Sequence, residues 1–184
     1  MSSNSLVEMK NITKKFGIVT ALNEISFKIN RGEVHVLLGE NGAGKSTLMK
    51  ILSGVYEPTS GKIVIGGRDY EFLTPKLSFE NKISIIYQEL SVINELSIQE
   101  NLFVGKLPTK KVFGVETVDY KYMEEVTNKI LTKIGLNRDP YTPVEELTIS
   151  EKQQVEIAKA LAADADVIIM DEPTTSLTEN ETSN

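Results

Sequence analysis

The chain has 184 residues, of which 40% are hydrophobic and 25% are charged. This composition is that of an ordinary globular protein and argues against global disorder. The length allows one domain, with or without a small inserted subdomain. The net charge of −6 argues against a broad nucleic-acid-binding surface, because Lys and Arg are not in excess to neutralise a phosphate backbone.

The chain has no cysteine, which excludes disulfides and thiolate metal sites and fits a reducing compartment. Residues 1–6 lack the basic start and apolar stretch of a secretory signal. No run approaches the roughly 18 apolar residues that span a membrane, so we expect any membrane role to be peripheral. The single histidine, His35, has no second His or Cys nearby, and we expect a core or rim histidine rather than a metal ligand.

The first predicted elements alternate between strand and turn. Residues 6–30 predict two short strands separated by a turn at Phe16 and Gly17. The apolar run 34–38 predicts a third strand, which leads through a glycine-rich segment into a helix that ends near Leu52. This order of strand, glycine-rich turn and helix is the context that a phosphate-binding loop needs.

Further turn signals predict a second hairpin. Residues 62–65 read as a strand, and Gly66 with Gly67 closes a hairpin with the residues that follow. Residues 75–82 then predict a helix, and residues 83–87 predict a buried strand. Together these elements predict a small antiparallel sheet beside a parallel core.

From about residue 96 to 162 the pattern becomes largely helical. Tyr120 to Ile134 has apolar residues at helical spacing and is ended by Gly135. Ser150 is the predicted N-cap of a second helix, residues 151–163. Residues 167–170 are a continuous apolar run that predicts a central strand.

The strongest functional signal is a glycine, four free positions, and then Gly-Lys-Ser. The residues are Gly39, Glu40, Asn41, Gly42, Ala43, Gly44, Lys45 and Ser46, followed by Thr47. Glycines let backbone N–H groups converge on phosphate oxygens without a Cβ in the way. Lys45 then reaches the β- and γ-phosphates, Ser46 offers a hydroxyl to Mg²⁺, and the helix dipole favours the anion. The alternative is a glycine-rich strand-to-helix turn that binds nothing.

A pair of acids follows the last predicted strand. Asp171 is placed to face the Mg²⁺ near Ser46, because open parallel sheets bind ligands at the carboxyl ends of their strands. Glu172 is placed to orient or deprotonate the attacking water at the γ-phosphate. Two adjacent carboxylates favour hydrolysis over nucleotide storage. Capping of a helix start by Asp171 is the alternative reading.

Two segments between these motifs carry a family resemblance. Residues 87–90 (Tyr-Gln-Glu-Leu) resemble the Q-loop, and residues 147–154 resemble a diverged signature of ATP-binding-cassette (ABC) ATPases, in matching order along essentially the whole chain. More narrowly, the chain resembles the first cassette of bacterial monosaccharide importers, of the D-allose type and then the ribose and galactose types. The segments that carry this narrower resemblance are residues 38–50, 86–91, 156–161 and 171–174.

The resemblance implies an α/β fold of the P-loop NTPase class and the ABC ATPase type. Its central sheet is mixed, with an antiparallel β subdomain and an inserted helical subdomain. Residues 1–90 and 164–184 would form the core with the β subdomain, and residues 91–163 the helical and signature subdomain.

The resemblance also implies roles for single residues. Phe16 would stack on adenine, although packing at the turn is an alternative. Gln88 would sense Mg²⁺ or the attacking water and act in catalysis with Lys45 and Glu172, and it would complete the metal set of Ser46 and Asp171. Without the family, Gln88 is a polar residue at a strand edge. The residues implied to reach ATP on an opposing cassette are Thr148, Ile149, Ser150 and Glu151.

The chain departs from the family pattern in three places. The signature usually has glycines at its third and fourth positions and Gln at its fifth, where this chain has Ile149, Ser150 and Glu151. Ile149 adds a β-branched side chain and Glu151 adds negative charge near a triphosphate. Thr178 stands where an Asp is typical. The chain also ends at Asn184, before a switch histidine and a second cassette, so we expect a C-terminally truncated chain or a fragment.

The expected function is that of an ATP-binding and ATP-hydrolysing subunit that energises monosaccharide import, with ATP and Mg²⁺ as cofactors. The expected partners are membrane permease subunits, a second cassette and, indirectly, an extracytoplasmic sugar-binding protein, at the cytoplasmic face of the inner membrane; no nucleic acid is expected. One alternative is a soluble ABC ATPase that does not transport. Another is a nucleotide-binding fragment with little turnover.

Overall fold

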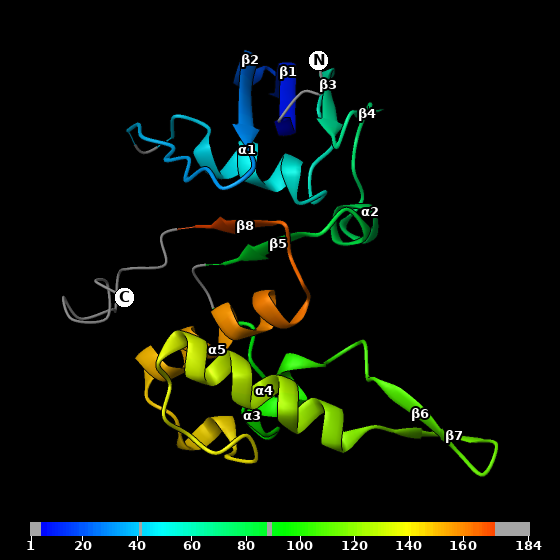
Figure 1. Ribbon diagram of the computed structural model, residues 1–184. Coiled ribbons are helices and arrows are strands. Elements are labelled where there is room, and N and C mark those ends of the chain that lie inside the picture. The colour runs from blue at the N-terminus through cyan, green and yellow to red at the C-terminus, as the bar shows by residue number, and fades with distance from the viewer. Residues whose placement is uncertain (1–4, 41, 88–89, 172–184) are drawn as a thin grey trace. The chain divides into compact units, whose positions relative to one another are not determined.

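The computed structural model describes residues 5–40, 42–87 and 90–171. Its chain divides into two compact units, Met1–Ile83 and Ser84–Asn184 (Figure 1). The sequence-based division into a core (1–90 and 164–184) and a helical subdomain (91–163) stays a prediction. No helix in the described part of the chain is long and apolar enough to cross a membrane.

The first unit contains a four-stranded antiparallel sheet with the order β2-β1-β3-β4. The strands are β1 (Ser5–Phe16), β2 (Val19–Asn30), β3 (Ser60–Ile65) and β4 (Arg68–Tyr70). Both predicted hairpins and the antiparallel sheet are confirmed, although β1 and β2 are each 12 residues long rather than short. Turns at Gly17 and at Gly66 with Gly67 have positive φ, which suits glycine.

Two helices accompany this sheet, α1 (Lys45–Leu52) and α2 (Pro75–Glu80). α1 buries Leu48, Ile51 and Leu52, which recur at the spacing of one helix face. α2 has Thr74 as its N-cap, whose hydroxyl accepts a hydrogen bond from the N–H of Leu77 at 3.2 Å. Both helices were predicted from sequence.

The predicted strand at residues 34–38 is not formed. These residues are all described, and none of them is in a strand. Val34, Val36 and Leu38 are 91%, 67% and 88% exposed. An apolar pattern predicts which faces could be buried, but a strand also needs a hydrogen-bonded neighbour, and no described segment pairs with these residues.

A two-stranded sheet pairs β5 (Ile83–Ile86), which begins at the last residue of the first unit, with β8 (Val167–Met170) of the second unit. The two strands run in the same direction (Figure 1), as parallel core strands were predicted to do. The N–H of Asp171 donates to the carbonyl of Ile86 at 3.1 Å. Pairing with β5 therefore continues to the first residue after β8.

The core of the second unit lies among α3 (Ile98–Leu102), α4 (Tyr120–Ile134) and α5 (Ile149–Ala162). α4 has the predicted bounds and ends at Gly135, whose φ is 73°. The buried apolar residues are Ile98, Leu102, Phe103, Met123, Ile130, Leu131, Leu136, Val144, Leu147, Val155 and Ala158. They include residues of all three helices and of the turn Val144–Glu146.

A β-hairpin interrupts the stretch that was predicted to be helical. β6 (Thr109–Val112) and β7 (Val115–Val118) pair antiparallel through Phe113 and Gly114. Both turn residues have positive φ, 50° and 84°, as a two-residue turn of the hairpin type requires. The signal that could have predicted this hairpin was Gly114 in a turn flanked by β-branched residues.

Candidate functional site

The phosphate-binding loop predicted at residues 39–46 curls around its own lysine. The ammonium of Lys45 donates to the carbonyls of Gly39 at 2.7 Å and Glu40 at 3.0 Å. The N–H of Ala43 donates to the same Glu40 carbonyl at 3.1 Å. Asn41 lies outside the described residues. The structure thus places the cation of Lys45 within the loop that was predicted to hold phosphate.

Two glycines of the loop adopt backbone conformations that side chains disfavour. Gly42 and Gly44 have φ values of 84° and 86°. At position 44 there is also no room, because a Cβ would lie 2.6 Å from the carbonyl oxygen of Ala21 and 2.7 Å from Cδ2 of Leu22. Gly44 therefore allows the loop to lie directly against the backbone of β2.

α1 begins immediately after Gly44. Its N-cap is Gly44 itself, without a side-chain hydrogen bond, and no acidic residue occupies its first turn. The N–H groups of a first helical turn have no partners within the helix, and the helix dipole adds partial positive charge there. Ser46 is exposed and Thr47 is half-buried in this turn. These residues fit an anionic phosphate group, as the sequence predicts.

Phe16 lies at the end of β1 and is 44% exposed. Its ring meets that of Tyr56 with centroids 5.4 Å apart and planes at 73°. The ammonium of Lys14 lies 5.0 Å from the Phe16 centroid. Sequence reasoning singled out Phe16 but missed Tyr56 and Lys14, because nothing in the spacing shows that the segment after α1 returns to β1.

The acidic half of the predicted site belongs to the second unit. Asp171 follows β8 and is half-buried, while Gln88 and Glu172 lie outside the described residues. The loop belongs to the first unit, so a joint site of Asp171 with Ser46 stays a prediction. Within the described ranges, no group of three or more His, Cys, Asp and Glu could hold a metal. The predicted Mg²⁺ ligands are not such a group, because they are the carboxylate of Asp171, the hydroxyl of Ser46 and the amide of Gln88.

The predicted signature segment forms the beginning of α5. The N-cap is Thr148, and the prediction that Ser150 caps this helix is wrong. The Thr148 hydroxyl accepts from the N–H of Glu151 at 3.3 Å, and the Glu151 carboxylate accepts from the N–H of Thr148 at 2.8 Å. Thr148 and Ser150 each have a residue of the capping-box type three positions later, Glu151 and Gln153, and the structure forms the reciprocal box with Thr148. Ile149 is 64% exposed.

The negative charge of Glu151 is matched within the same unit. The guanidinium Nε of Arg138 donates to Glu151 Oε1 at 2.7 Å. The Arg138 hydrogen bond, supported by those from Thr148, lowers the pKa of Glu151 from its ordinary 4.5 to about 2. Glu151 was expected to oppose a triphosphate at this helix start, but the structure pairs its charge with Arg138.

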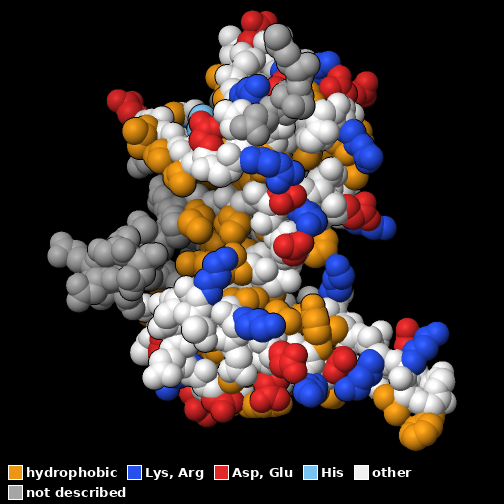
Figure 2. All heavy atoms as spheres, viewed as in Figure 1, with side chains coloured by type: hydrophobic (Ala, Val, Ile, Leu, Met, Phe, Trp, Pro, Cys, Tyr) orange, Lys and Arg blue, Asp and Glu red, His pale blue; other side chains and the backbone are white. Residues whose placement is uncertain are grey.

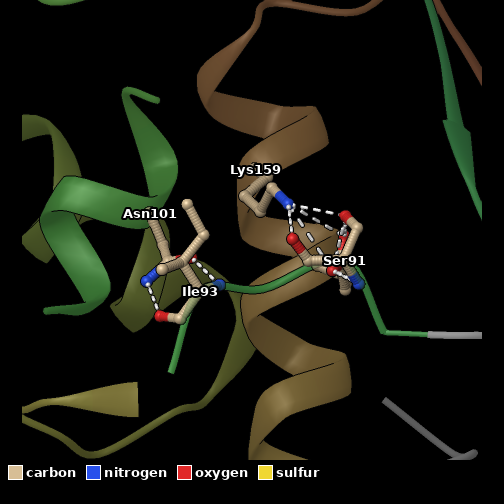
Figure 3. Close-up of polar contacts among 5 residues, drawn as sticks. Ser91, Ile93, Asn101 and Lys159 are labelled. Carbon is tan, nitrogen blue, oxygen red and sulfur yellow. Dashed lines mark hydrogen bonds and ion pairs between the residues drawn. The ribbon is translucent and has the colours of Figure 1, made fainter. Parts of the chain in front are cut away.

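Polar contacts also tie α5 to the segment that follows Gln88 (Figure 3). Glu156, 6% exposed, accepts from the N–H of Ser91 at 2.6 Å and from its hydroxyl at 2.8 Å. Lys159 donates to the Ser91 hydroxyl at 2.8 Å. Asn101 of α3 holds Ile93 through both backbone groups, at 2.8 and 2.9 Å. Sequence reasoning missed these contacts. The signal that could have found them was Glu156, an acid on the buried side of α5.

The surface charge of the chain is mixed. In Figure 2, Lys and Arg side chains are interspersed with Asp and Glu side chains over the visible face. Several of the neighbours form ion pairs, such as Lys62 with Asp69 at 2.5 Å and Lys110 with Asp119 at 2.9 Å. Exposed pairs of this kind contribute little to stability.

The known proteins that are similar to this chain are of one kind, ATP-binding proteins of ABC transporters. A family model described as ABC transporter matches residues 22–175. The chain is 48% identical over 181 residues to a galactose/methyl galactoside import ATP-binding protein of Clostridium tetani, covering 98% of this chain and 36% of that protein. It is 51% identical over 175 residues to a D-allose import ATP-binding protein of Escherichia coli, covering 95% and 34%. It is 45% identical over 185 residues to an arabinose import ATP-binding protein of Vibrio parahaemolyticus, covering 100% and 36%.

Solved structures of ATP-binding cassettes share the fold. The ADP conformation of the cassette MJ1267 superposes with a TM-score of 0.84 at 26% identity, covering 98% of this chain and 74% of that one. A nucleotide-free cassette superposes with a TM-score of 0.81 at 25% identity, covering 97% and 73%. The predicted fold class, an α/β P-loop NTPase of the ABC ATPase type, is confirmed. The chain spans about a third of the length of the sugar-import relatives, 34% to 36%.

Replacing Gly44 by Ala should lower the free energy of unfolding more than replacing Gly42 by Ala. Both positions have φ near 85°, so each substitution carries a backbone cost of about 1 kcal/mol. Only at position 44 would the new Cβ also collide with Ala21 and Leu22, which should add about 1 to 3 kcal/mol. Urea denaturation of the two variants measures the difference, and equal losses would contradict the close approach of the loop to β2.

Replacing Arg138 by Met should destabilise the chain in a pH-dependent way. The lowered pKa of Glu151 stabilises the fold above pH 4.5, and this contribution is lost as the pH falls toward 2. The variant should therefore be less stable than the unmodified chain at pH 7, with a modest loss because the pair is partly exposed, and the loss should shrink progressively below pH 4.5. Urea denaturation across this pH range checks the slope. Lys121→Met, which removes an exposed pair with Glu125, is the control and should cost under about 0.5 kcal/mol.

Proposed function

The chain belongs to the ABC transporter family, and on that premise we propose that it is an ATP-binding and ATP-hydrolysing part of a monosaccharide importer. The observation that carries the proposal is the loop before α1, where Lys45 lies among backbone groups and Gly44 closes on β2. The three relatives are import ATP-binding proteins for galactose and methyl galactoside, D-allose, and arabinose. Their variety supports the sugar class, and D-allose or a ribose-like sugar is the finer proposal.

In this proposal the first unit binds the nucleotide. Backbone N–H groups from Gly39 to Thr47, with Glu40, Asn41 and Ala43 among them, surround the phosphates. The ammonium of Lys45 exchanges its present carbonyl partners for phosphate oxygens, which are charged and therefore stronger acceptors. Phe16 offers its exposed ring to the adenine by stacking.

The second unit supplies the hydrolytic residues. Asp171 and Gln88, with Ser46 of the first unit, would hold Mg²⁺, which neutralises the charge of the phosphates when it is bound. Glu172 would orient the attacking water and accept its proton, and Gln88 would position that water. Of the second unit's residues in this set, the structure describes Asp171, which is half-buried and whose N–H donates to the carbonyl of Ile86.

Turnover in this proposal needs a second cassette. Thr148, Ile149, Ser150 and Glu151 would meet the ATP of that partner through the start of α5. Because Arg138 pairs with Glu151, the acid in this segment does not present an uncompensated charge to a triphosphate. Permease subunits at the cytoplasmic face of the membrane would be the further partners, and an extracytoplasmic sugar-binding protein would act through them.

Replacing Lys45 by Ala should weaken Mg-ATP binding at least tenfold. The substitution removes a charge-assisted contact to the phosphates, and each 1.4 kcal/mol lost is a factor of ten in the dissociation constant. Isothermal titration of the chain with Mg-ATP measures the effect. Lys76→Ala, which removes a lysine that is 86% exposed in the same unit, is the control, and equal affinities in the two variants would count decisively against the site.

Replacing Glu172 by Gln should stop hydrolysis and leave nucleotide affinity within about twofold, because the amide cannot accept the proton of the attacking water. Phosphate release by the assembled transporter, alongside ATP titration, separates the two effects. Glu125→Gln, at an acid that is 58% exposed on α4, should change neither. A Glu172→Gln transporter that hydrolyses at the normal rate would remove Glu172 from its proposed role.

A further inference from the structure

We propose that Tyr56 is a positioning residue for the base of the bound nucleotide, acting by holding the ring of Phe16 in place for stacking. The proposal rests on the proposed function and adds a specific source of affinity for the adenine half of ATP. It concerns the first unit alone, in which both aromatic residues are described.

The two rings form a favourable aromatic pair at the surface. Their centroids are 5.4 Å apart and their planes meet at 73°, so the edge of one ring faces the other. Phe16 remains 44% exposed and Tyr56 is only half-buried. The pair is therefore not a piece of the hydrophobic core. Its geometry restrains Phe16 while leaving part of the ring open to a ligand.

Tyr56 is held by the end of α1, the helix that begins at the phosphate-binding loop. The N–H groups of Val55 and Tyr56 both donate to the carbonyl of Lys50, at 2.8 and 3.0 Å. The ammonium of Lys50 lies 5.5 Å from the Tyr56 centroid, which is within the range of a cation–π contact. The position of the Tyr56 ring thus follows from that of α1.

Lys14 completes the contact from the side of β1. Its ammonium donates to the carbonyl of Glu57 at 2.6 Å and lies 5.0 Å from the Phe16 centroid and 5.8 Å from that of Tyr56. One cation therefore contacts both rings and the backbone that follows Tyr56. Because the ammonium of Lys14 is held by this hydrogen bond, its stem and charge stay in one place. The cation–π contact then restrains the neighbouring ring of Phe16.

Backbone bonds hold the same two segments together. The N–H of Thr59 donates to the carbonyl of Thr13 at 2.7 Å, and the N–H of Lys15 donates to the Thr59 hydroxyl at 3.0 Å. The strand that presents Phe16 is thereby attached to the segment that presents Tyr56. A single short helix, α1, consequently has the phosphate-binding loop at its start and the support of the stacking ring at its end.

The experiment titrates the full chain with Mg-ATP and, separately, with inorganic triphosphate and Mg²⁺. Tyr56→Leu should weaken ATP binding roughly three- to tenfold, the range of an aromatic contact, and should leave triphosphate affinity within twofold. Tyr56→Phe keeps the ring and should bind ATP like the unmodified chain. Tyr70→Leu, at another half-buried tyrosine of this unit, is the control and should leave the ratio of the two affinities unchanged.

A double-mutant cycle tests whether Tyr56 acts through Phe16. Phe16→Leu should lower ATP affinity by a similar factor, while Phe72→Leu, which removes a ring of the same 44% exposure, should not. In the Phe16→Leu background, Tyr56→Leu should cause no further loss, because the ring that it positions is already gone. Fully additive losses would overturn the positioning role.

The remaining outcomes also decide the proposal. Unchanged ATP affinity in Tyr56→Leu, or an equal loss for ATP and triphosphate, would overturn it, the latter because the damage would extend to the phosphate site. If Tyr56→Leu fails to fold, Lys14→Met takes its place, and a selective loss of ATP affinity is again required. An unmodified chain that binds neither ligand would instead refute the proposed function.

Discussion

The first unit depends on the contact between Gly44 and the backbone of β2. A Cβ at position 44 would lie 2.6 Å from the carbonyl oxygen of Ala21, so only glycine lets α1 begin there. That placement sets the curl of the loop around Lys45 and leaves the first-turn N–H groups of α1 without a side-chain cap. The end of α1 then holds Tyr56, which meets Phe16. Phosphate and base recognition would accordingly share one support.

Charge compensation has the corresponding importance in the second unit. α5 carries two acids that would be unfavourable if they were unpaired, one at its start and one on its buried side. Glu151 is satisfied by Thr148 and Arg138, and Glu156 by Ser91 and Lys159. Partly buried carboxylates need such partners. These contacts make the N-terminus of α5 a well-defined structure although its sequence departs from the usual signature, and they tie α5 to the segment that follows Gln88.

Local patterns predicted much of the fold. α4 has its predicted bounds because its apolar spacing and Gly135 are both local signals, and the first two hairpins follow from alternation and turn residues. The run at residues 34–38 has the pattern of a strand without a described neighbour to pair with. The hairpin of β6 and β7 was missed because two strands of four residues each carry a weak signal inside a helical stretch. Ser150 was preferred to Thr148 because the capping box was not recognised.

By itself, the sequence determined the identities and order of the phosphate-binding loop, the acid pair and the intervening motifs, and through them the ABC family and the cassette fold. These features are encoded in residue types at short spacing, where backbone chemistry is local. Only the tertiary structure decided that Tyr56 and Lys14 support Phe16, that Arg138 neutralises Glu151, and that Gly44 touches Ala21. Tyr56 and Phe16, Arg138 and Glu151, and Gly44 and Ala21 are each 13 or more positions apart in the sequence. The exception is Lys14, which is a near neighbour of Phe16. Such contacts depend on where the folded chain returns, and spacing along the sequence does not specify that.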